Sequence, residues 1–216
     1  MEYQTPQIKA VFFDQGNVLD NYAPQTSAMA KLLGMTDSEF RKYAAPHIRS
    51  YHLGLDEMEF LSRVCKDAGV TPPSHPIFRE TFYENRPFNY GLLHVNAQLR
   101  VLGLKTGIIS NAERPLRDIL FEEYIGKEPQ QFDVVVCSCD VGYAKPDEQI
   151  FYAACQKLEV EPRHTVFIDD VLAYAKAFKK LGGQGIHHID NSTTVRALPN
   201  IIGHELALGK YGTRSL

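Results

Sequence analysis

The sequence predicts an α/β fold, a doubly wound (Rossmann-like) parallel sheet with a helical cap subdomain inserted after its first strand. Two observations support the sheet: short segments dense in Val, Ile and Phe recur along the chain, and segments with helical periodicity separate them. A third observation supports the insertion, because residues 22–89 contain helical patterns and no strand candidate. The expected core therefore consists of residues 1–21 and 90–216, and the expected cap of residues 22–89.

The predicted strands are mostly apolar at consecutive positions, a pattern expected for parallel strands that are buried on both faces. They span residues 8–14, 105–111, 132–139, 164–170 and 184–190. The first of them reads IKAVFFD and ends in a carboxylate, which is followed at once by Gly16 and Asn17. Such an ending places a charged group at the edge of the sheet, next to a segment with little side-chain bulk.

Helical patterns connect these strands. Residues 146–158 carry apolar side chains at helical spacing, and we expect Pro146 in the first turn of that helix, where its missing N–H costs little. Residues 170–181 end in two lysines before Gly182, a combination that favours a helix stop. Residues 91–103 are expected to form a further helix that leads into the second strand.

Two helix starts are expected within the insertion. TDSEF places Thr36 and Glu39 at the spacing of a capping box, and LDEMEF places Asp56 and Glu59 in a similar arrangement. The second of these helices is expected to end at Gly69. These local signals predict helices in the insertion without reference to the rest of the chain.

The composition limits the expected partners. The 216-residue chain is 44% hydrophobic and has a net charge of −3, so we expect neither a nucleic-acid nor a membrane partner. No apolar run approaches the ~18 residues of a bilayer span, and the segment MEYQTPQIKA lacks the apolar region of a signal peptide. With 4 cysteines and no C-x-x-C pair, a cytoplasmic protein with reduced thiols is expected. The sequence leaves both monomer and homodimer open.

Polar side chains follow the predicted strands where each strand ends. They are Asp14, Ser110, Asn111, Lys145, Asp169 and Asp170. Ligands of open α/β sheets bind at the carboxyl ends of the strands. The carboxylates would repel one another without a cation, and ligands made only of oxygen indicate Mg²⁺. The hydroxyl and the ammonium would then face a phosphate group, to which they can donate hydrogen bonds.

The segments VFFDQGNVL, IISNAE, AKPDEQIF and VFIDD resemble, in order and spacing, the four motifs of the haloacid dehalogenase superfamily. The resemblance covers roughly residues 8–22 and 90–190, and the insertion resembles the cap that many members carry. The segment HLGLDEMEF is similar to part of the cap in the branch of sugar-phosphate (glucose-1-phosphate-type) phosphatases.

This resemblance implies a Mg²⁺-dependent phosphatase that hydrolyses small phosphorylated metabolites, with sugar phosphates favoured. Asp14 would attack phosphorus, and water would then hydrolyse the aspartyl-phosphate. The implied metal ligands are the carboxylate of Asp14, the main-chain carbonyl of Gly16, and Asp169 and Asp170, and the implied phosphate ligands are Ser110, Asn111 and Lys145. Which member of the Asp169 and Asp170 pair would bind the metal directly stays open.

The sequence departs from the family pattern at Gly16, where most of the resembling phosphatases carry an aspartate that acts as general acid and base. Such a group is worth about 10² to 10⁴-fold in rate. The substrate could have a good leaving group, a water or a nearby acid such as Asp20 could substitute, or activity could be low. Val171 and Tyr174 make a second departure, because relatives often carry Ser or Asn there.

Two other functions are compatible with the same scaffold. A ligand-binding or regulatory protein would explain both departures, at Gly16 and Val171. A 2-haloacid dehalogenase would use Asp14 to attack carbon without a metal, but paired acids such as Asp169 and Asp170 have little use there without a cation. A mutase is less favoured, because it also needs the missing acid and base.

Overall fold

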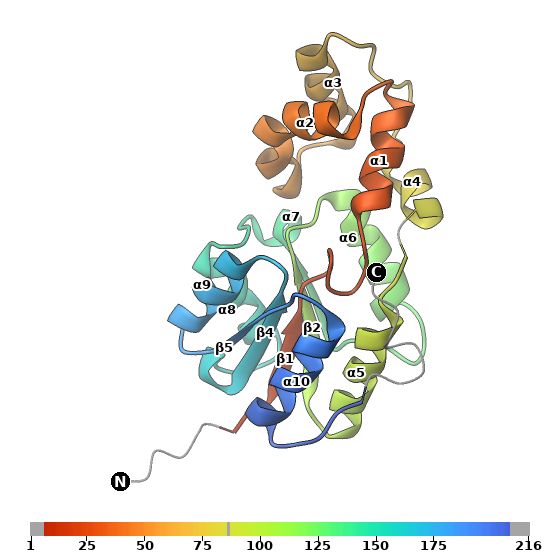
Figure 1. Cartoon of the computed structure of the whole chain (residues 1–216). Coiled ribbons are helices and arrows are strands. Elements are labelled where there is room, and N and C mark those ends of the chain that lie inside the picture. The colour runs from red at the N-terminus through yellow and green to blue at the C-terminus, as the bar shows by residue number, and fades with distance from the viewer. Residues whose placement is uncertain (1–6, 86, 208–216) are drawn as a thin grey trace.

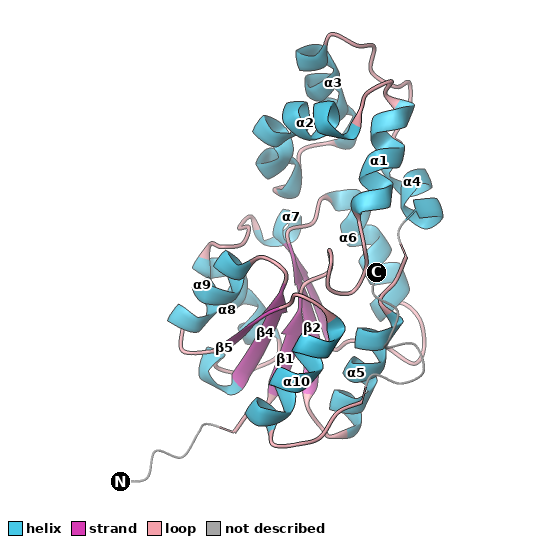
Figure 2. Cartoon of the chain, viewed as in Figure 1, coloured by secondary structure: helices cyan, strands magenta, loops and turns pink. Residues whose placement is uncertain are grey.

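The computed structural model describes residues 7–85 and 87–207. Within these residues, five parallel strands form one sheet in the order β3-β2-β1-β4-β5 (Figures 1 and 2). The strands are β1 (Ala10–Phe13), β2 (Lys105–Ser110), β3 (Val134–Cys137), β4 (Thr165–Asp169) and β5 (Gln184–His187). The predicted doubly wound parallel sheet is therefore confirmed, with each strand somewhat shorter than the apolar segment that predicted it.

Helices cover both faces of this sheet. They are α5 (Tyr90–Val101), α6 (Arg114–Leu120), α7 (Ser138–Val141), α8 (Glu148–Lys157), α9 (Leu172–Lys180) and α10 (Asn191–Ile202), with a π-helical turn at Phe121–Ile125 and a 3₁₀ turn at Pro162–His164. Side chains of β1 alternate between the two faces. Val11 and Phe13 join the apolar cluster under α5, α6 and α10, whereas Ala10 and Phe12 join the cluster under α8 and α9. Both faces are thus buried, which explains the consecutive apolar residues of the strand.

β1 lies at the centre of the sheet, between β2 and β4. Its last residue, Phe13, pairs with Ile108 of β2 and Ile168 of β4. The next residue, Asp14, donates its backbone N–H to the carbonyl of Ile168 at 2.8 Å before the chain leaves the sheet. Because all strands are parallel, their polar ends meet at one edge, as the sequence predicts.

The start of α8 differs from the prediction. The helix begins at Glu148, so Pro146 lies before it and not in its first turn. The side chain of Asn111 accepts the Lys145 N–H at 2.6 Å and donates to the Lys145 carbonyl at 3.0 Å. These bonds hold the backbone before Pro146 against the end of β2, outside the helix. The expected stop of α9 before Gly182 is confirmed, since the helix ends at Lys180.

The segment between β1 and α5 is helical. Its helices are α1 (Ala23–Leu32), α2 (Asp37–His52), α3 (Glu57–Ala68) and α4 (Phe78–Asn85). The Thr36 and Glu39 capping box at the start of α2 is confirmed, as is the end of α3 at a left-handed Gly69. Asp56 caps α3 through the N–H groups of residues 58 and 59, but no reciprocal bond from Glu59 is present in the described part, where its carboxylate pairs with Arg63. No helix of the described chain is both long and apolar enough to cross a membrane.

The helical segment leaves the core and returns to it at the same place. The Asn21 N–H donates to the Pro87 carbonyl at 3.1 Å, and the Asn89 N–H donates to the Leu19 carbonyl at 2.7 Å. Helix α2 contacts α7, and α4 contacts α6. The helical segment therefore stands over the edge of the sheet where the strands end (Figure 1).

Candidate active site

The loop after β1 fixes the position of Asp14, whose side chain is largely buried. One of its oxygens, Oδ1, accepts the Gln15 N–H at 2.7 Å. The N–H groups of residues 18–20 all donate to the Gln15 carbonyl, which closes the loop tightly. Asn17 takes a left-handed backbone conformation (φ 56°), which Asn tolerates better than most residues. The loop thus places Asp14 and Gly16 on the wall of one cavity.

A single lysine holds two of the predicted acids together. The Lys145 Nζ lies 2.7 Å from Asp14 Oδ1 and 2.7 Å from Asp169 Oδ2, and its side chain is almost completely buried. Asp170 completes the group, since one oxygen from each of the three carboxylates lies within 4.8 Å of the others. One ammonium therefore faces three carboxylates at the carboxyl edge of the sheet.

The electrostatics of this acid cluster follow from burial and from its excess of negative charge. Burial raises the pKa of Asp14 to about 8; the Lys145 ammonium opposes that shift, and Asp169 and Asp170 add to it. Burial also raises the pKa of Asp170. For Lys145, burial disfavours the charged form, but Asp14 and Asp169 outweigh it and raise the pKa. Oxygen donors with unbalanced negative charge fit a hard divalent cation, which would stabilise the ionised carboxylates.

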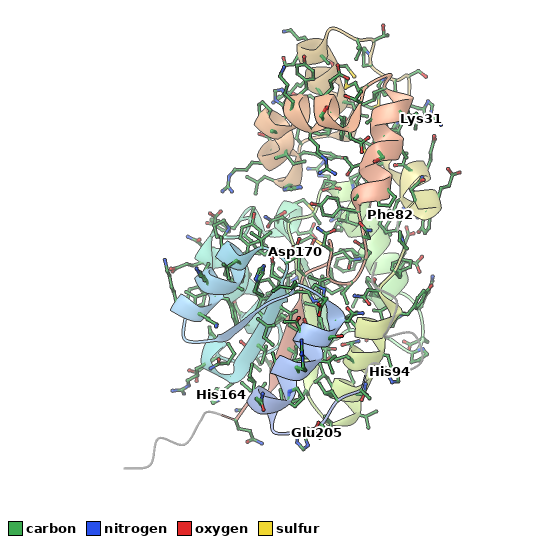
Figure 3. All side chains as sticks on the ribbon, viewed as in Figure 1. Lys31, Phe82, His94, His164, Asp170 and Glu205 are labelled. Atoms are coloured by element: carbon green, nitrogen blue, oxygen red, sulfur yellow. The ribbon has the colours of Figure 1, made fainter. Side chains whose placement is uncertain are left out.

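The two neighbouring acids have different surroundings. Asp169 is completely buried, and both of its oxygens are hydrogen-bonded: Oδ1 accepts the Val171 N–H at 2.7 Å and Oδ2 faces Lys145. Asp170, which Figure 3 labels, is half-buried and lines the cavity. Its Oδ2 accepts a bond from the Asn17 amide at 2.9 Å. Asp170 is thus the member of the pair that faces the cavity, whereas Asp169 lies behind it and contacts Lys145.

Two further predicted residues lie at the end of β2. Ser110 is largely buried and lines the cavity, and its hydroxyl makes no hydrogen bond to the described part of the chain. The Asn111 side chain is bonded at both ends to the main chain of Lys145. Ser110 therefore has a donor to offer a ligand, while the Asn111 amide positions the loop that carries Lys145.

The residue considered as a substitute acid, Asp20, does not fit that role. It is completely buried and is not among the residues that line the cavity. Its Oδ2 accepts a bond from the Gln15 side chain at 2.5 Å, and its backbone bridges to Phe88. Asp20 therefore belongs to the connection between the sheet and the helical segment.

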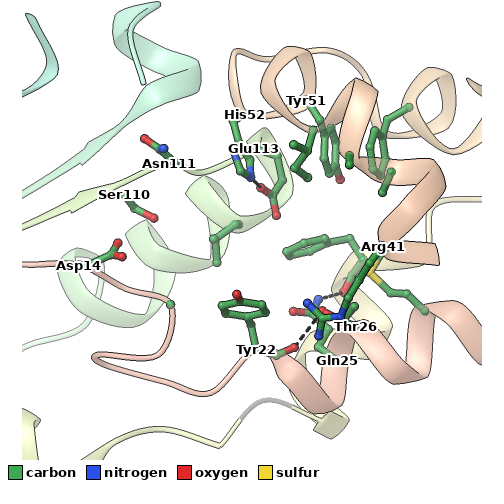
Figure 4. A pocket seen from close by; sticks show the side chains of 18 of the residues that line it. Asp14, Tyr22, Gln25, Thr26, Arg41, Tyr51, His52, Ser110, Asn111 and Glu113 are labelled. Carbon is green, nitrogen blue, oxygen red and sulfur yellow. Dashed lines mark hydrogen bonds and ion pairs between the residues drawn. The ribbon is translucent and has the colours of Figure 1, made fainter. Parts of the chain in front are cut away.

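The cavity has a volume of about 400 Å³ and extends from Asp14 to the helical segment. Figure 4 shows Asp14 and Ser110 at one end and Arg41 at the other. Among the wall residues that the sequence did not assign is His52, whose Nε2 lies 3.7 Å from Glu113 Oε2. Burial lowers the pKa of His52 to about 4, and Lys145 and Arg49 add to this effect. The helical periodicity of α2 was the signal in the sequence that could have pointed to His52. That periodicity does not show which face of the helix meets the core.

The sequence is similar to known hydrolases. Residues 8–182 match the family described as haloacid dehalogenase-like hydrolase. The chain is 28% identical over 222 residues to acyl-CoA dehydrogenase family member 10 of Mus musculus, covering 95% of this chain and 20% of that protein. It is 32% identical over 159 residues to bifunctional epoxide hydrolase 2 of Sus scrofa, covering 69% of this chain and 28% of that protein. The chain therefore spans well under a third of these two relatives.

Solved structures share the fold at lower sequence identity. A HAD family enzyme of Bacteroides thetaiotaomicron, solved as an aspartate-to-alanine mutant with magnesium and inorganic phosphate, matches with a TM-score of 0.65 and 21% identity, covering 82% of this chain and 92% of that one. A HAD-like family hydrolase of Porphyromonas gingivalis matches with a TM-score of 0.68 and 18% identity, covering 92% of this chain and 100% of that one. At these identities the likeness concerns the fold.

Proposed function

The chain belongs to the haloacid dehalogenase-like hydrolase family, and we propose that it is a Mg²⁺-dependent phosphatase of small phosphorylated molecules. The observation that carries this proposal is the acid cluster of Asp14, Asp169 and Asp170, in which the Lys145 ammonium contacts the first two and Asp170 lies beside them. The enzyme of B. thetaiotaomicron, which has the same fold, was crystallised with magnesium and inorganic phosphate. We further propose that residues 22–89 act as a cap over this site.

The ion would be held by oxygens that face the cavity. They are the carboxylates of Asp14 and Asp170 and, as the sequence suggests, the main-chain carbonyl of Gly16. Asp169 would contribute indirectly, because its oxygens already bind Lys145 and the Val171 N–H. When bound, the cation would neutralise phosphate charge and keep Asp14 ionised.

The chain's own residues would carry the reaction in two steps. Asp14 Oδ1 is held by the Gln15 N–H and by Lys145, so Oδ2 is the oxygen available to attack phosphorus. The bond from phosphorus to the leaving oxygen breaks, and an aspartyl-phosphate forms on Asp14. A water oxygen then attacks phosphorus, which releases inorganic phosphate and regenerates the carboxylate. The Ser110 hydroxyl and the Lys145 ammonium would stabilise the phosphoryl oxygens in both steps.

The experiment that tests this function is turnover of p-nitrophenyl phosphate with Mg²⁺ and in chelator. The proposal expects metal-dependent release of phosphate. A ligand-binding or regulatory protein would show no turnover even with this activated leaving group. A 2-haloacid dehalogenase would release halide from 2-chloropropionate in chelator. Sugar phosphates belong in the same assay, since the sequence favours them.

Binding of Mg²⁺ at pH 7 is expected to release close to one proton. Without the ion Asp14 is mostly protonated at this pH, because its pKa is about 8, and with the ion it is ionised. The affinity for Mg²⁺ should therefore rise as the pH increases from 6 to 8, by up to about tenfold per pH unit, and level off above 8. Calorimetry in two buffers that differ in ionisation enthalpy measures the released proton. The Asp14→Asn variant should release none, and a pH-independent affinity in the wild type would contradict the assignment.

Proton transfer to the leaving oxygen is the step that Gly16 leaves unassisted. His52 does not replace a carboxyl group there, because it is neutral near pH 7 and neutral imidazole is a weak acid. Gly16→Asp is therefore expected to raise kcat for alkyl phosphates by about 10²-fold, with less than about threefold change for p-nitrophenyl phosphate. Gly16→Asn is the matched control, since it adds similar bulk without an acid. An equal gain for both substrates, or a gain with asparagine, would show that proton supply is not what limits the wild type.

A further inference from the structure

The cavity has two chemically unlike ends. Its inner end, at the edge of the sheet, carries the charged and polar groups of the acid cluster and Ser110. The rest of the wall comes mainly from the helical segment and from α6. We call this outer part the apolar chamber, and its principal wall residues are Met29, Phe40, Ala44, Phe60, Phe78 and Leu116, all of which are buried.

The sequence of α2 makes the chamber both apolar and roomy. Phe40, Ala44 and Ile48 recur every four residues, so they lie on one face of the helix, and all three line the cavity. Ala44 and its neighbour Ala45 leave space where larger side chains would fill it. Ala45 and Arg41 are exposed, so they lie where the chamber reaches the surface.

The polar side chains that α1 contributes to the chamber wall are bonded to the protein, while Arg41 lies at the exposed mouth and His52 lies beside Glu113. The Gln25 amide donates to the Phe78 carbonyl at 3.1 Å, and the Thr26 hydroxyl donates to the Tyr22 carbonyl at 3.2 Å. The first bond joins α1 to α4, and the second lies within the first turn of α1. A ligand rich in hydroxyl groups would lose its bonds to water in this chamber and find few replacements, which is costly for each unpaired group.

Tyr51 contributes an aromatic face to the chamber. Its ring stacks on Phe60 with a centroid distance of 4.1 Å, and its side chain lines the chamber (Figure 4). The hydroxyl is buried and makes no hydrogen bond to any described residue. Because this hydroxyl has almost no accessible surface, even toward the cavity, Tyr51 offers a bound molecule its aromatic ring and no reachable hydrogen-bonding atom.

We propose that the substrate is a phosphate monoester whose carbon part is mainly apolar and lies in the apolar chamber. This inference rests on the proposed phosphatase function and adds the class of substrate to it. The acid cluster, Ser110 and Lys145 would bind the phosphate, while the flat and branched side chains of the chamber would contact the carbon part. Sugar phosphates would then be poorer substrates, because most of their hydroxyl groups would face apolar side chains.

A matched pair of substrates tests this inference. Cyclohexylmethyl phosphate and glucose 6-phosphate both carry the phosphate on a CH₂ group attached to a six-membered ring. Only glucose 6-phosphate bears hydroxyl groups on that ring. We expect kcat/KM to be at least about 30-fold higher for cyclohexylmethyl phosphate. Equal values, or a preference for the sugar, would overturn the inference, while hydrolysis of either compound that depends on Asp14 would leave the proposed function standing.

Binding distinguishes failure of the inference from failure of the proposed function. If neither compound nor p-nitrophenyl phosphate is hydrolysed, the proposed function is wrong. Calorimetry with the corresponding non-hydrolysable phosphonates then decides the inference separately. Binding of the cyclohexyl compound at least about tenfold more tightly than the sugar compound supports the apolar chamber as its site, and the reverse order excludes it.

Variants on α2 locate the carbon part. Ala45→Leu is expected to lower kcat/KM for cyclohexylmethyl phosphate at least about tenfold more than for acetyl phosphate, whose small acyl group needs little of the chamber. Lys42→Leu is the matched control, because this exposed residue is on the same helix but does not line the cavity. It should change neither substrate. Parallel losses for both substrates in Ala45→Leu would place the carbon part elsewhere.

Discussion

Replacing Asp14 with asparagine is expected to lower kcat for p-nitrophenyl phosphate at least about 10⁴-fold, as loss of a nucleophile commonly does. The amide keeps the size of the side chain but cannot attack phosphorus. Brief incubation with labelled substrate followed by acid quenching should trap labelled protein in the wild type and none in the variant. Steady-state turnover and trapping together separate loss of the nucleophile from a defect in a later step.

The matched control for this substitution is Asp118→Asn. Asp118 is exposed on α6, pairs with Arg117, and does not line the cavity. Its replacement should leave kcat within about twofold, as expected for a surface substitution away from the site. Near-normal turnover in Asp14→Asn, with the protein folded, would remove Asp14 from the mechanism and favour the ligand-binding function.

Lys145→Met is expected to destabilise the metal-free protein by about 3 to 5 kcal/mol, because it leaves the buried Asp169 carboxylate without its counter-charge. The Lys145 ammonium lies 2.7 Å from oxygens of both Asp14 and Asp169, and within the described residues no other cation contacts these two acids. The same change should lower kcat/KM at least about 10²-fold, since the phosphate loses its ammonium partner. Urea denaturation in chelator measures the first effect.

The effect of Mg²⁺ on the melting temperature provides a second test of the role of Lys145. Without the ammonium the acid cluster carries more unbalanced negative charge, so saturating Mg²⁺ should raise the melting temperature of Lys145→Met more than that of the wild type. Lys176→Met, on the exposed side of α9, should behave as the wild type in every assay. If chelated Lys145→Met were as stable as the wild type, the acid cluster would not depend on this lysine.

The sequence was sufficient to predict which strand ends contribute residues to the candidate site. Asp14, Ser110 and Asp169 come at the ends of apolar segments, and parallel strands bring such ends to one edge whatever the helices between them do. The division of roles within the site could not be predicted. Asp169 and Asp170 are adjacent in sequence, yet only the second lines the cavity.

Local signals explain which features the sequence determined by itself. The Thr36 and Glu39 capping box, the stop at Gly69 and the apolar segments of the strands depend on residues a few positions apart, so their pattern is visible without the fold. The tertiary structure decided what depends on contacts between distant residues. Asn111 bonds the main chain of Lys145, 34 positions away, next to Pro146, which lies outside the helix that the local pattern predicted for it.

The apolar chamber belongs to the second kind of feature. Helix α2 is amphipathic in any arrangement, but only its packing over the sheet shows that the face with Phe40 and Ala44 borders a cavity that reaches Asp14. A periodic pattern records which side of a helix avoids water and does not record what that side faces. The sequence by itself thus determined the sheet and the polar side chains at its edge, while the packing of the helical segment decided the shape of the cavity that these side chains border.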